Sequence, residues 1–299
     1  MFTDLAVPSI AQIIRKGADY LSVEGIPNAR LEAEVLLAHA LAMERIQLYM
    51  RPDQIISLKD RERYQEALVK RGQNMPLAYI TGSKEFYSLD LHVNENVLIP
   101  RPETELLVDW LLALFSDGKH WHLNNIVELG TGTGAVTVAL AYNLLKAGHK
   151  DFRIYATDIS WAALQVAREN IERLQVGEVI ELFEGDIYRA LPESILSKVG
   201  VIVSNPPYIP SGDIGGLAPE IREYEPIGAL DGGVEGLDFY GPILDEGRRF
   251  LVDGGRVLLE IGDGQGRQVM DMAAKLGYGD IELHADYGAR ERMVTARWR

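Results

Sequence analysis

The feature that most constrains the fold is a regular alternation of short apolar runs with longer amphipathic stretches after residue 124. An apolar run of strand length ends at Leu129, and the helical pattern of residues 135–147 follows it directly. Strands and helices that alternate in this way form right-handed βαβ units around a parallel sheet with helices on both faces. Four more apolar runs continue the pattern, at residues 153–158, 179–186, 199–205 and 256–261.

The C-terminal part adds helical patterns at residues 239–250 and 265–276 and two last strands, at residues 281–285 and 293–298. The short connection of residues 286–292 between these strands favours an antiparallel edge. The sequence therefore predicts an α/β domain with a Rossmann-like, seven-stranded sheet.

The first hundred residues follow other patterns. Apolar side chains recur three and four residues apart from Ser9 to about Lys70, which predicts a small helical bundle. Residues 85–94 alternate apolar and polar side chains, and the apolar run of residues 96–100 follows after a short turn, so we expect a β-hairpin. We predict three parts: a helical domain at residues 1–74, a β-hairpin linker at 75–102 and the α/β domain at 103–299.

Composition excludes several classes of function. The 299 residues carry a net charge of −14, and an acidic surface repels nucleic-acid phosphates, which disfavours duplex DNA as a partner. The chain has no cysteine, which excludes disulfides and thiolate chemistry, and its six scattered histidines form no HExxH motif, so we expect no metal. The N-terminus shows no signal or transit pattern and no apolar run is long enough to span a membrane, so we expect a cytoplasmic protein.

A glycine-rich motif follows the strand that ends at Leu129 and precedes a helix. Glycines at such a turn let the backbone bend and approach a ligand closely, while the helix N-terminus offers free N–H groups. Their spacing differs from the dinucleotide pattern GxGxxG and resembles an S-adenosylmethionine site. We therefore expect cofactor contacts from Gly130, Thr131, Gly132, Thr133 and Gly134.

Two more strand ends carry acidic residues. Asp158 ends the next strand, where a carboxylate accepts the hydroxyls of a ribose; the alternative role is an N-cap for the following helix. Asp186 and Ile187 follow the third strand, and we expect them to contact the amine and the ring of adenine. A plain turn at the strand end is the alternative.

The most specific motif is Asn205-Pro206-Pro207-Tyr208, after the fourth strand. Two prolines fix φ and lack N–H donors, so the loop is rigid and presents carbonyl oxygens. An amide or aromatic amine nitrogen is planar and poorly nucleophilic, but the side-chain oxygen of Asn205 and the carbonyl of Pro206 can hold its hydrogens and direct its lone pair toward a methyl group. The ring of Tyr208 can pack over this flat group. We predict that Asn205, Pro206 and Tyr208 are catalytic and that Pro207 contacts the substrate.

The sequence resembles the bacterial peptide chain release factor N5-glutamine methyltransferases, the PrmC/HemK family. The resemblance covers nearly the whole chain and lies mainly in residues 76–109, 127–141, 203–210 and 286–292. It implies S-adenosylmethionine as methyl donor, S-adenosylhomocysteine as product, and the glutamine of the Gly-Gly-Gln motif of class-1 release factors as substrate. It also implies that the helical domain recognises the release factor and that residues 130–134, Asp158, Ile187 and Asn205 contact the cofactor.

Two positions depart from the family pattern, since Glu128 replaces the commoner Asp and Ile187 stands where some relatives have Trp. We expect a monomer that contacts neither nucleic acid nor membrane. A ribosomal-protein glutamine methyltransferase, an N6-adenine methyltransferase and a binding protein without catalysis are the alternatives. An adenine methyltransferase would need a basic face, which a net charge of −14 disfavours.

Arg101 and Glu103 come from the block IPRPETE, and we expect them to line the substrate site; Glu103 alternatively stabilises the start of the next helix through its dipole. Residues 206–242 are rich in glycine and proline, and long irregular loops of this kind usually bind a ligand or cover a site. Four acidic residues of this loop are expected to form a solvated face, or else to attract a basic partner: Asp213, Glu220, Glu223 and Glu225.

Overall fold

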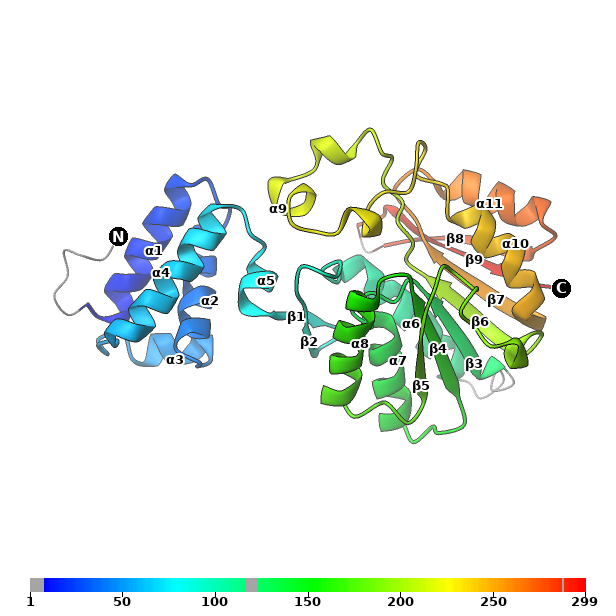
Figure 1. The fold of residues 1–299 in the computed structure, drawn as a ribbon, viewed down its shortest axis with the longest axis horizontal. Coiled ribbons are helices and arrows are strands. Elements are labelled where there is room, and N and C mark those ends of the chain that lie inside the picture. The colour runs from blue at the N-terminus through cyan, green and yellow to red at the C-terminus, as the bar shows by residue number, and fades with distance from the viewer. Residues whose placement is uncertain (1–7, 117–122, 287) are drawn as a thin grey trace. The chain divides into compact units, whose positions relative to one another are not determined.

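The computed structural model describes residues 8–116, 123–286 and 288–299. The chain divides into two compact units, one of Met1–Ser83 with Ala218–Tyr224 and one of Lys84–Leu217 with Glu225–Arg299. Figure 1 shows that the first unit is helical and that the second is built around a sheet. A segment from the long loop of the α/β domain therefore belongs to the helical unit, which a division into consecutive ranges does not foresee.

The helical unit is a bundle, as the spacing of its apolar residues predicts. Its core contains Ile10, Ile13, Leu36 and Leu68, all completely buried. Ser9 accepts a hydrogen bond from the backbone of Gln12, and Gln12 returns one to Ser9, so a capping box begins the first helix. The helices are α1 (Ile10–Val23), α2 (Ala29–Ala40), α3 (Arg45–Met50), α4 (Leu58–Gly72) and the short α5 (Leu77–Thr81), which the sequence pattern does not predict.

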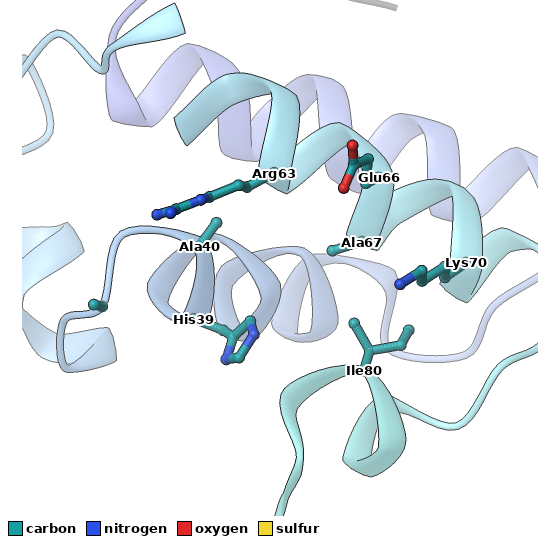
Figure 2. Close-up of a pocket in the computed structure, with 8 residues that line it drawn as sticks. His39, Ala40, Arg63, Glu66, Ala67, Lys70 and Ile80 are labelled. Atoms are coloured by element: carbon teal, nitrogen blue, oxygen red, sulfur yellow. The ribbon is translucent and has the colours of Figure 1, made fainter. Parts of the chain in front are cut away.

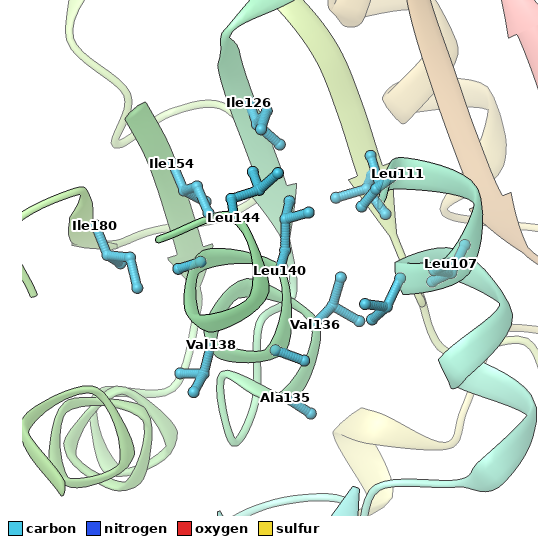
Figure 3. Close-up of a cluster of buried hydrophobic side chains, with 14 of the residues drawn as sticks. Leu107, Leu111, Ile126, Ala135, Val136, Val138, Leu140, Leu144, Ile154 and Ile180 are labelled. Atoms are coloured by element: carbon cyan, nitrogen blue, oxygen red, sulfur yellow. The ribbon is translucent and has the colours of Figure 1, made fainter. Parts of the chain in front are cut away.

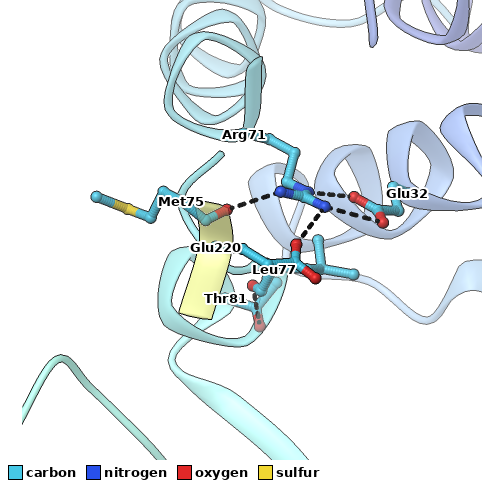
Figure 4. Close-up of polar contacts among 6 residues, drawn as sticks. All are labelled: Glu32, Arg71, Met75, Leu77, Thr81 and Glu220. Atoms are coloured by element: carbon cyan, nitrogen blue, oxygen red, sulfur yellow. Dashed lines mark hydrogen bonds and ion pairs between the residues drawn. The ribbon is translucent and has the colours of Figure 1, made fainter. Parts of the chain in front are cut away.

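Arg71 on α4 links the bundle to α9 (Pro219–Arg222). Its side chain is 4% exposed, and its guanidinium donates to Glu32 at 2.5 Å, to Glu220 at 2.8 Å and to the carbonyl of Met75 at 3.3 Å (Figure 4). A guanidinium has five donors, so one buried Arg can satisfy two carboxylates and a carbonyl together.

The expectation of a solvated acidic face in the long loop is wrong for Glu225. Asp213 and Glu223 are exposed, and Glu220, whose side chain is 44% exposed, pairs with the buried Arg71 of the helical unit. Glu225 is 4% exposed and belongs to the other unit, where it accepts from Arg101 at 2.6 Å. Its other oxygen accepts from a backbone N–H at 3.2 Å. Charge pattern alone does not show which carboxylates find buried partners.

The bundle also has a pocket, shown in Figure 2. Arg63 and Lys70 from α4 give it two cations, and Glu66 lies between them along the same helix. All of its lining residues belong to the helical unit: His39, Ala40, Ala42, Arg63, Glu66, Ala67, Lys70 and Ile80.

The β-hairpin exists, but its turn is not where the sequence predicts it. The two strands are β1 (Ser83–Phe86) and β2 (Leu89–His92), joined by Tyr87 and Ser88. Both turn residues have positive φ, 51° and 59°, which hairpin turns usually assign to Asn or Gly. The apolar run 96–100 forms no strand. A turn without Asn or Gly leaves no sequence signal, so the predicted turn is one segment too late.

The second unit contains the predicted seven-stranded sheet, in the order β5-β4-β3-β6-β7-β9-β8. The first five strands of this order are parallel, and β9 runs antiparallel to both of its neighbours, so the expected antiparallel edge is present. The strands are β3 (Asn125–Leu129), β4 (Arg153–Asp158), β5 (Ile180–Glu184), β6 (Val199–Ser204), β7 (Leu251–Glu260), β8 (Gly279–Ala285) and β9 (Glu291–Arg297).

Helices cover both faces of this sheet. Ile126 and Ile154 face the helices α6 and α7, where they pack with residues such as Leu140 (Figure 3). Val127, one residue along β3, faces the opposite side, which is covered by α10 and α11. The helices are α6 (Glu105–Ser116), α7 (Ala135–Lys146), α8 (Trp161–Arg173), α10 (Tyr240–Phe250) and α11 (Gly266–Lys275); short 3₁₀ turns are η1 (Pro102–Thr104), η3 (Glu193–Ile195), η4 (Ile214–Gly216) and η5 (Ile227–Ala229).

Across the residues that the structure describes, the helices are too short or too polar for any of them to cross a membrane.

Candidate active site

Strand register brings the predicted motifs to one edge of the sheet. Leu129 at the end of β3 pairs with Thr157 of β4 on one side and with Ser204 of β6 on the other. Ser204 in turn pairs with Leu259 of β7. Because these strands are parallel, the residues next in sequence after these four paired residues lie side by side: Gly130, Asp158, Asn205 and Glu260. Ligands of open α/β sheets bind at this carboxyl edge.

The glycine loop has the conformation that its residues permit. Gly130, Gly132 and Gly134 have φ of 72°, 54° and 76°, a region that other residues rarely adopt. At Gly130 and Gly132 no other atom lies within 4 Å of where a Cβ would be, so both face open space. The backbone of the loop can therefore come close to a ligand.

The amides of this loop are less free than the sequence suggests. The N–H groups of Gly130 and Thr131 both donate to the carbonyl of Thr157 at 2.9 Å, and that of Gly132 donates to Asp158 at 2.8 Å. These bonds fix the conformation of the loop and use N–H groups that a ligand could otherwise bind. The loop therefore serves a ligand mainly by letting its backbone come close.

Glu128 lies beneath the loop and is 5% exposed. One oxygen accepts from the hydroxyl of Thr131 at 2.7 Å, and from the backbone and hydroxyl of Thr137 at the start of α7. Burial raises the pKa of its carboxyl to about 7, although hydrogen bonds from Thr137 and Thr131 lower it. The Glu that replaces the family's commoner Asp therefore ties the loop to the helix that follows.

Asp158 is not the helix N-cap that was the alternative role. Ser160 caps α8 by accepting from the backbone of Ala163, and Asp158 accepts instead from Gly132 and from Ser160 N–H at 2.9 Å. Burial raises the pKa of its carboxyl, against the lowering effect of these hydrogen bonds. Each oxygen keeps a lone pair for a ligand hydroxyl.

Asp186 and Ile187 lie just after β5, as predicted. Asp186 forms an exposed ion pair with Arg189 at 3.2 Å. Ile187 has a positive φ of 51°, and its carbonyl accepts from the hydroxyl of Thr157 at 3.0 Å. This bond ties the turn after β5 to the end of β4.

The Asn-Pro-Pro-Tyr loop is held from the side of β7 and α11. The amide of Gln265 donates to the carbonyl of Tyr208 at 3.0 Å and to that of Gly236 at 3.1 Å. The hydroxyl of Tyr208 donates to Glu260 at 3.4 Å, and burial raises the pKa of this phenol. Pro206 and Pro207 follow Asn205 directly, so their φ angles stiffen the backbone at the sheet edge.

Asn205 contacts a residue that the sequence analysis missed. Its Nδ2 donates to the hydroxyl of Thr104, which is 5% exposed and belongs to η1. Glu260 is also new: it is 2% exposed, and burial raises its pKa to about 7. Thr104 directly follows the predicted Glu103 in the IPRPETE block, so the block was a signal for it. Glu260 lies in an apolar strand, and no sequence signal indicated it.

Arg101 and Glu103 lie near the same loop, where Arg101 lowers and Glu103 raises the pKa of the Tyr208 phenol. Arg101 is engaged by Glu225, whose second oxygen binds the backbone N–H of Ile99. The block therefore contributes an ion pair in which Arg101, one of the two residues predicted to line the site, holds the buried Glu225 of the long loop.

The described residues hold no group of three or more His, Asp or Glu side chains suited to a metal. His120 and His122, two of the six histidines considered, lie outside the described residues, as does Tyr287 in the connection between the last two strands.

The glycine loop, the half-buried carboxylate of Asp158 and the open space at Gly130 fit a nucleoside ligand, and Asn205 lies at the end of the adjoining strand. A sheet of this topology with these motifs at its carboxyl edge defines an S-adenosylmethionine-dependent methyltransferase. Two family profiles match the chain, described as "PrmC N-terminal domain" over residues 12–82 and "Methyltransferase small domain" over residues 103–215.

The chain is 37% identical to the release factor glutamine methyltransferase of Geobacter sulfurreducens over 288 residues, which covers 95% of this chain and 96% of that protein. It is 38% identical to that of Moorella thermoacetica, with 96% and 98% covered. The protein belongs to the release factor glutamine methyltransferase family.

Among solved structures, the catalytic domain of hMettl16 in complex with a MAT2A 3′UTR hairpin shares the fold. The TM-score is 0.55 at 13% identity, and the match covers 83% of this chain and 85% of that one.

Proposed function

We propose that this protein transfers a methyl group from S-adenosylmethionine to the N5 side-chain amide nitrogen of the glutamine in the Gly-Gly-Gln motif of class-1 release factors. The observation that carries the proposal is Asn205 at the sheet edge beside Gly130, with its Nδ2 already engaged by Thr104. Its Oδ1 is then the atom left to accept an N–H from a substrate amide.

S-Adenosylmethionine, when bound, supplies a methyl group on a positively charged sulfur. Residues 130–134 would lie against its amino-acid part, Asp158 would accept the ribose hydroxyls, and Asp186 and Ile187 would lie beside the adenine. The open space at Gly130 and the desolvated carboxylate of Asp158 support these assignments.

The substrate amide must be held because its nitrogen lone pair is delocalised. The Oδ1 of Asn205 and the carbonyl of Pro206 would accept its two N–H hydrogens, and the ring of Tyr208 would lie against its plane. Orientation of the lone pair toward the methyl group then does most of the catalysis. The bonds from Gln265 to Tyr208 and Gly236 support a rigid loop that loses little entropy on binding.

We also propose that the helical unit recognises the release factor and that the protein acts as a cytoplasmic monomer, without direct nucleic-acid contact. The profile match over residues 12–82 and the cationic pocket at Arg63 and Lys70 support a role for the bundle in protein recognition. The net charge of −14 supports a protein substrate over a nucleic acid.

The test is methyl transfer from labelled S-adenosylmethionine to a purified release factor, beside the same factor with its loop glutamine replaced. We expect label on the first protein and none on the second. Equal label on both would overturn the proposal. A ribosomal protein and an adenine-containing oligonucleotide, tested in parallel, represent the two competing substrates, and faster labelling of either would replace the proposed one.

A further inference from the structure

We propose that Thr104 and Glu260 are positioning residues that fix the side-chain amide of Asn205 in one of its two orientations, so that Oδ1 and not Nδ2 faces the substrate. The proposal rests on the methyl transfer proposed above and deepens it. It assigns roles to two buried polar residues that contact the Asn-Pro-Pro-Tyr loop from different elements, η1 and β7.

The contacts form a chain. Nδ2 of Asn205 donates to Oγ1 of Thr104 at 3.2 Å. The Thr104 hydroxyl lies close enough to the Glu260 carboxyl to lower its pKa as a donor, and Oε1 of Glu260 accepts from the hydroxyl of Tyr208 at 3.4 Å. The chain therefore begins and ends in the Asn-Pro-Pro-Tyr loop. All four residues lie in the same compact unit.

The direction in which each hydrogen bond of this series donates follows from the number of protons available. An ionised carboxylate only accepts, and a hydroxyl has a single proton to donate. Oε2 of Glu260 is buried and accepts no hydrogen bond from the described residues, and the Thr104 hydroxyl is the neighbouring group that can donate its proton to this carboxyl. The hydroxyl oxygen can then only accept, and the group of Asn205 that faces it must be the NH₂.

The opposite orientation would be costly. If Oδ1 of Asn205 faced Thr104, the hydroxyl would have to donate to it, and its proton would no longer be available to the Glu260 carboxyl, whose Oε2 is buried and accepts from no described residue. The NH₂ of Asn205 would then face the N–H groups of the substrate amide, and two donors cannot form a hydrogen bond with each other. Asparagine alone has no preference between the two orientations, because its oxygen and nitrogen ends are nearly equal in shape.

This series of hydrogen bonds depends on the ionisation of Glu260. Several groups face this carboxyl: Arg292 of β9 lowers its pKa, Glu103 of η1 raises it, and Tyr208 lowers it by hydrogen bonding, while Tyr240 of α10 also lies near. Burial outweighs them and places the pKa at about 7. Below that pH the protonated carboxyl no longer requires the proton of Thr104, so the orientation of Asn205 loses its bias.

The experiment measures kcat, KM for the release factor and affinity for S-adenosylmethionine in Thr104→Val, Thr104→Ser and Glu260→Gln. We expect Thr104→Val to lower kcat about 10- to 100-fold, with cofactor affinity unchanged. Thr104→Ser keeps the hydroxyl and should stay within about threefold of the wild type. The kcat of the wild type should rise with pH through about 7, and Glu260→Gln should lose this rise.

Thr295→Val is the matched control, because Thr295 is a buried threonine of β9 that forms a hydrogen bond with His284 and takes no part in the hydrogen bonds described above. It should keep the kcat and the pH profile of the wild type. A Thr104→Val enzyme within twofold of wild-type kcat, or an unchanged pH profile in Glu260→Gln, would overturn the inference. If Thr104→Val fails to fold, the pH profile of Glu260→Gln decides alone. If the wild type does not label the release factor, it is the proposed function that fails.

Discussion

The position of Asn205 and the orientation of its side-chain amide have separate structural causes, which the motif alone does not show. Its position beside Gly130 follows from the pairing of Ser204 with Leu129, and its orientation follows from Thr104. A side chain placed by strand register and oriented by a buried hydroxyl needs little reorganisation when a substrate binds.

Replacement of Asn205 by Ala removes the proposed acceptor. We expect kcat/KM for the release factor to fall by about 10²–10³, or about 2.7–4 kcal/mol, as for the loss of one oriented polar group. Steady-state kinetics measure this, and calorimetric titration with S-adenosylmethionine should show nearly unchanged affinity. Activity equal to that of the wild type would contradict the acceptor role.

Glu128 makes stability depend on pH. Its pKa is about 7 in the folded protein and near 4.5 in the unfolded chain, so the folded state holds the proton more tightly. The stabilisation is complete below about pH 4.5 and is lost as the pH rises through about 7. The size of the effect is on the order of 3 kcal/mol.

We therefore expect Glu128→Gln to lose less stability than the wild type between pH 5.5 and pH 8. Urea denaturation at both pH values measures the difference. Glu235→Gln, at an exposed position, is the control and should follow the wild type. An identical loss in Glu128→Gln and the wild type would show that Glu128 does not cause the dependence.

At the scale of elements, a single arginine holds a distant segment. Arg71 on α4 is buried, and it pairs with Glu32 of α2 and with Glu220 of α9. Tyr224 adds a bond from its hydroxyl to the carbonyl of Gln73 at 2.6 Å. Residues 218–224 are therefore joined to the helical unit by polar contacts from two of their side chains.

Arg71→Ala should release this segment and destabilise the bundle by about 3 kcal/mol, because Glu32 is left mostly buried without its cation. Glu220→Ala should cost about 1 kcal/mol or less, since its side chain is 44% exposed. Hydrogen exchange of residues 218–224 is the measurement, and it should be faster in both variants. Arg267→Ala, which loses an exposed pair on α11, should leave the exchange unchanged.

At the scale of the whole molecule, the two units differ in the functional residues that they contain. The α/β unit holds all the residues proposed to bind the cofactor and the glutamine, whereas the helical unit holds a pocket with Arg63 and Lys70. This difference supports the proposal that the α/β unit carries out methyl transfer and that the helical unit recognises the protein substrate.

Charge reversal in the pocket tests that division. Arg63→Glu together with Lys70→Glu should raise KM for the release factor roughly tenfold, because rim charges mainly affect association. The kcat and the affinity for S-adenosylmethionine should not change. A matched pair of reversals on α11, Arg267→Glu and Lys275→Glu, should leave KM unaltered. If both pairs change KM equally, net charge and not the bundle surface is responsible.

The sequence alone determined the sheet, its flanking helices and the places of the main motifs, because periodicity and glycine or proline spacing depend on neighbouring residues. Ser160 as N-cap and the hairpin turn at Tyr87 and Ser88 were missed, since several local patterns compete there. Only the tertiary structure decided that Glu225 is buried and that Thr104 and Glu260 meet the Asn-Pro-Pro-Tyr loop. These contacts join residues far apart in the chain, and strand register, which no local pattern encodes, brings them together.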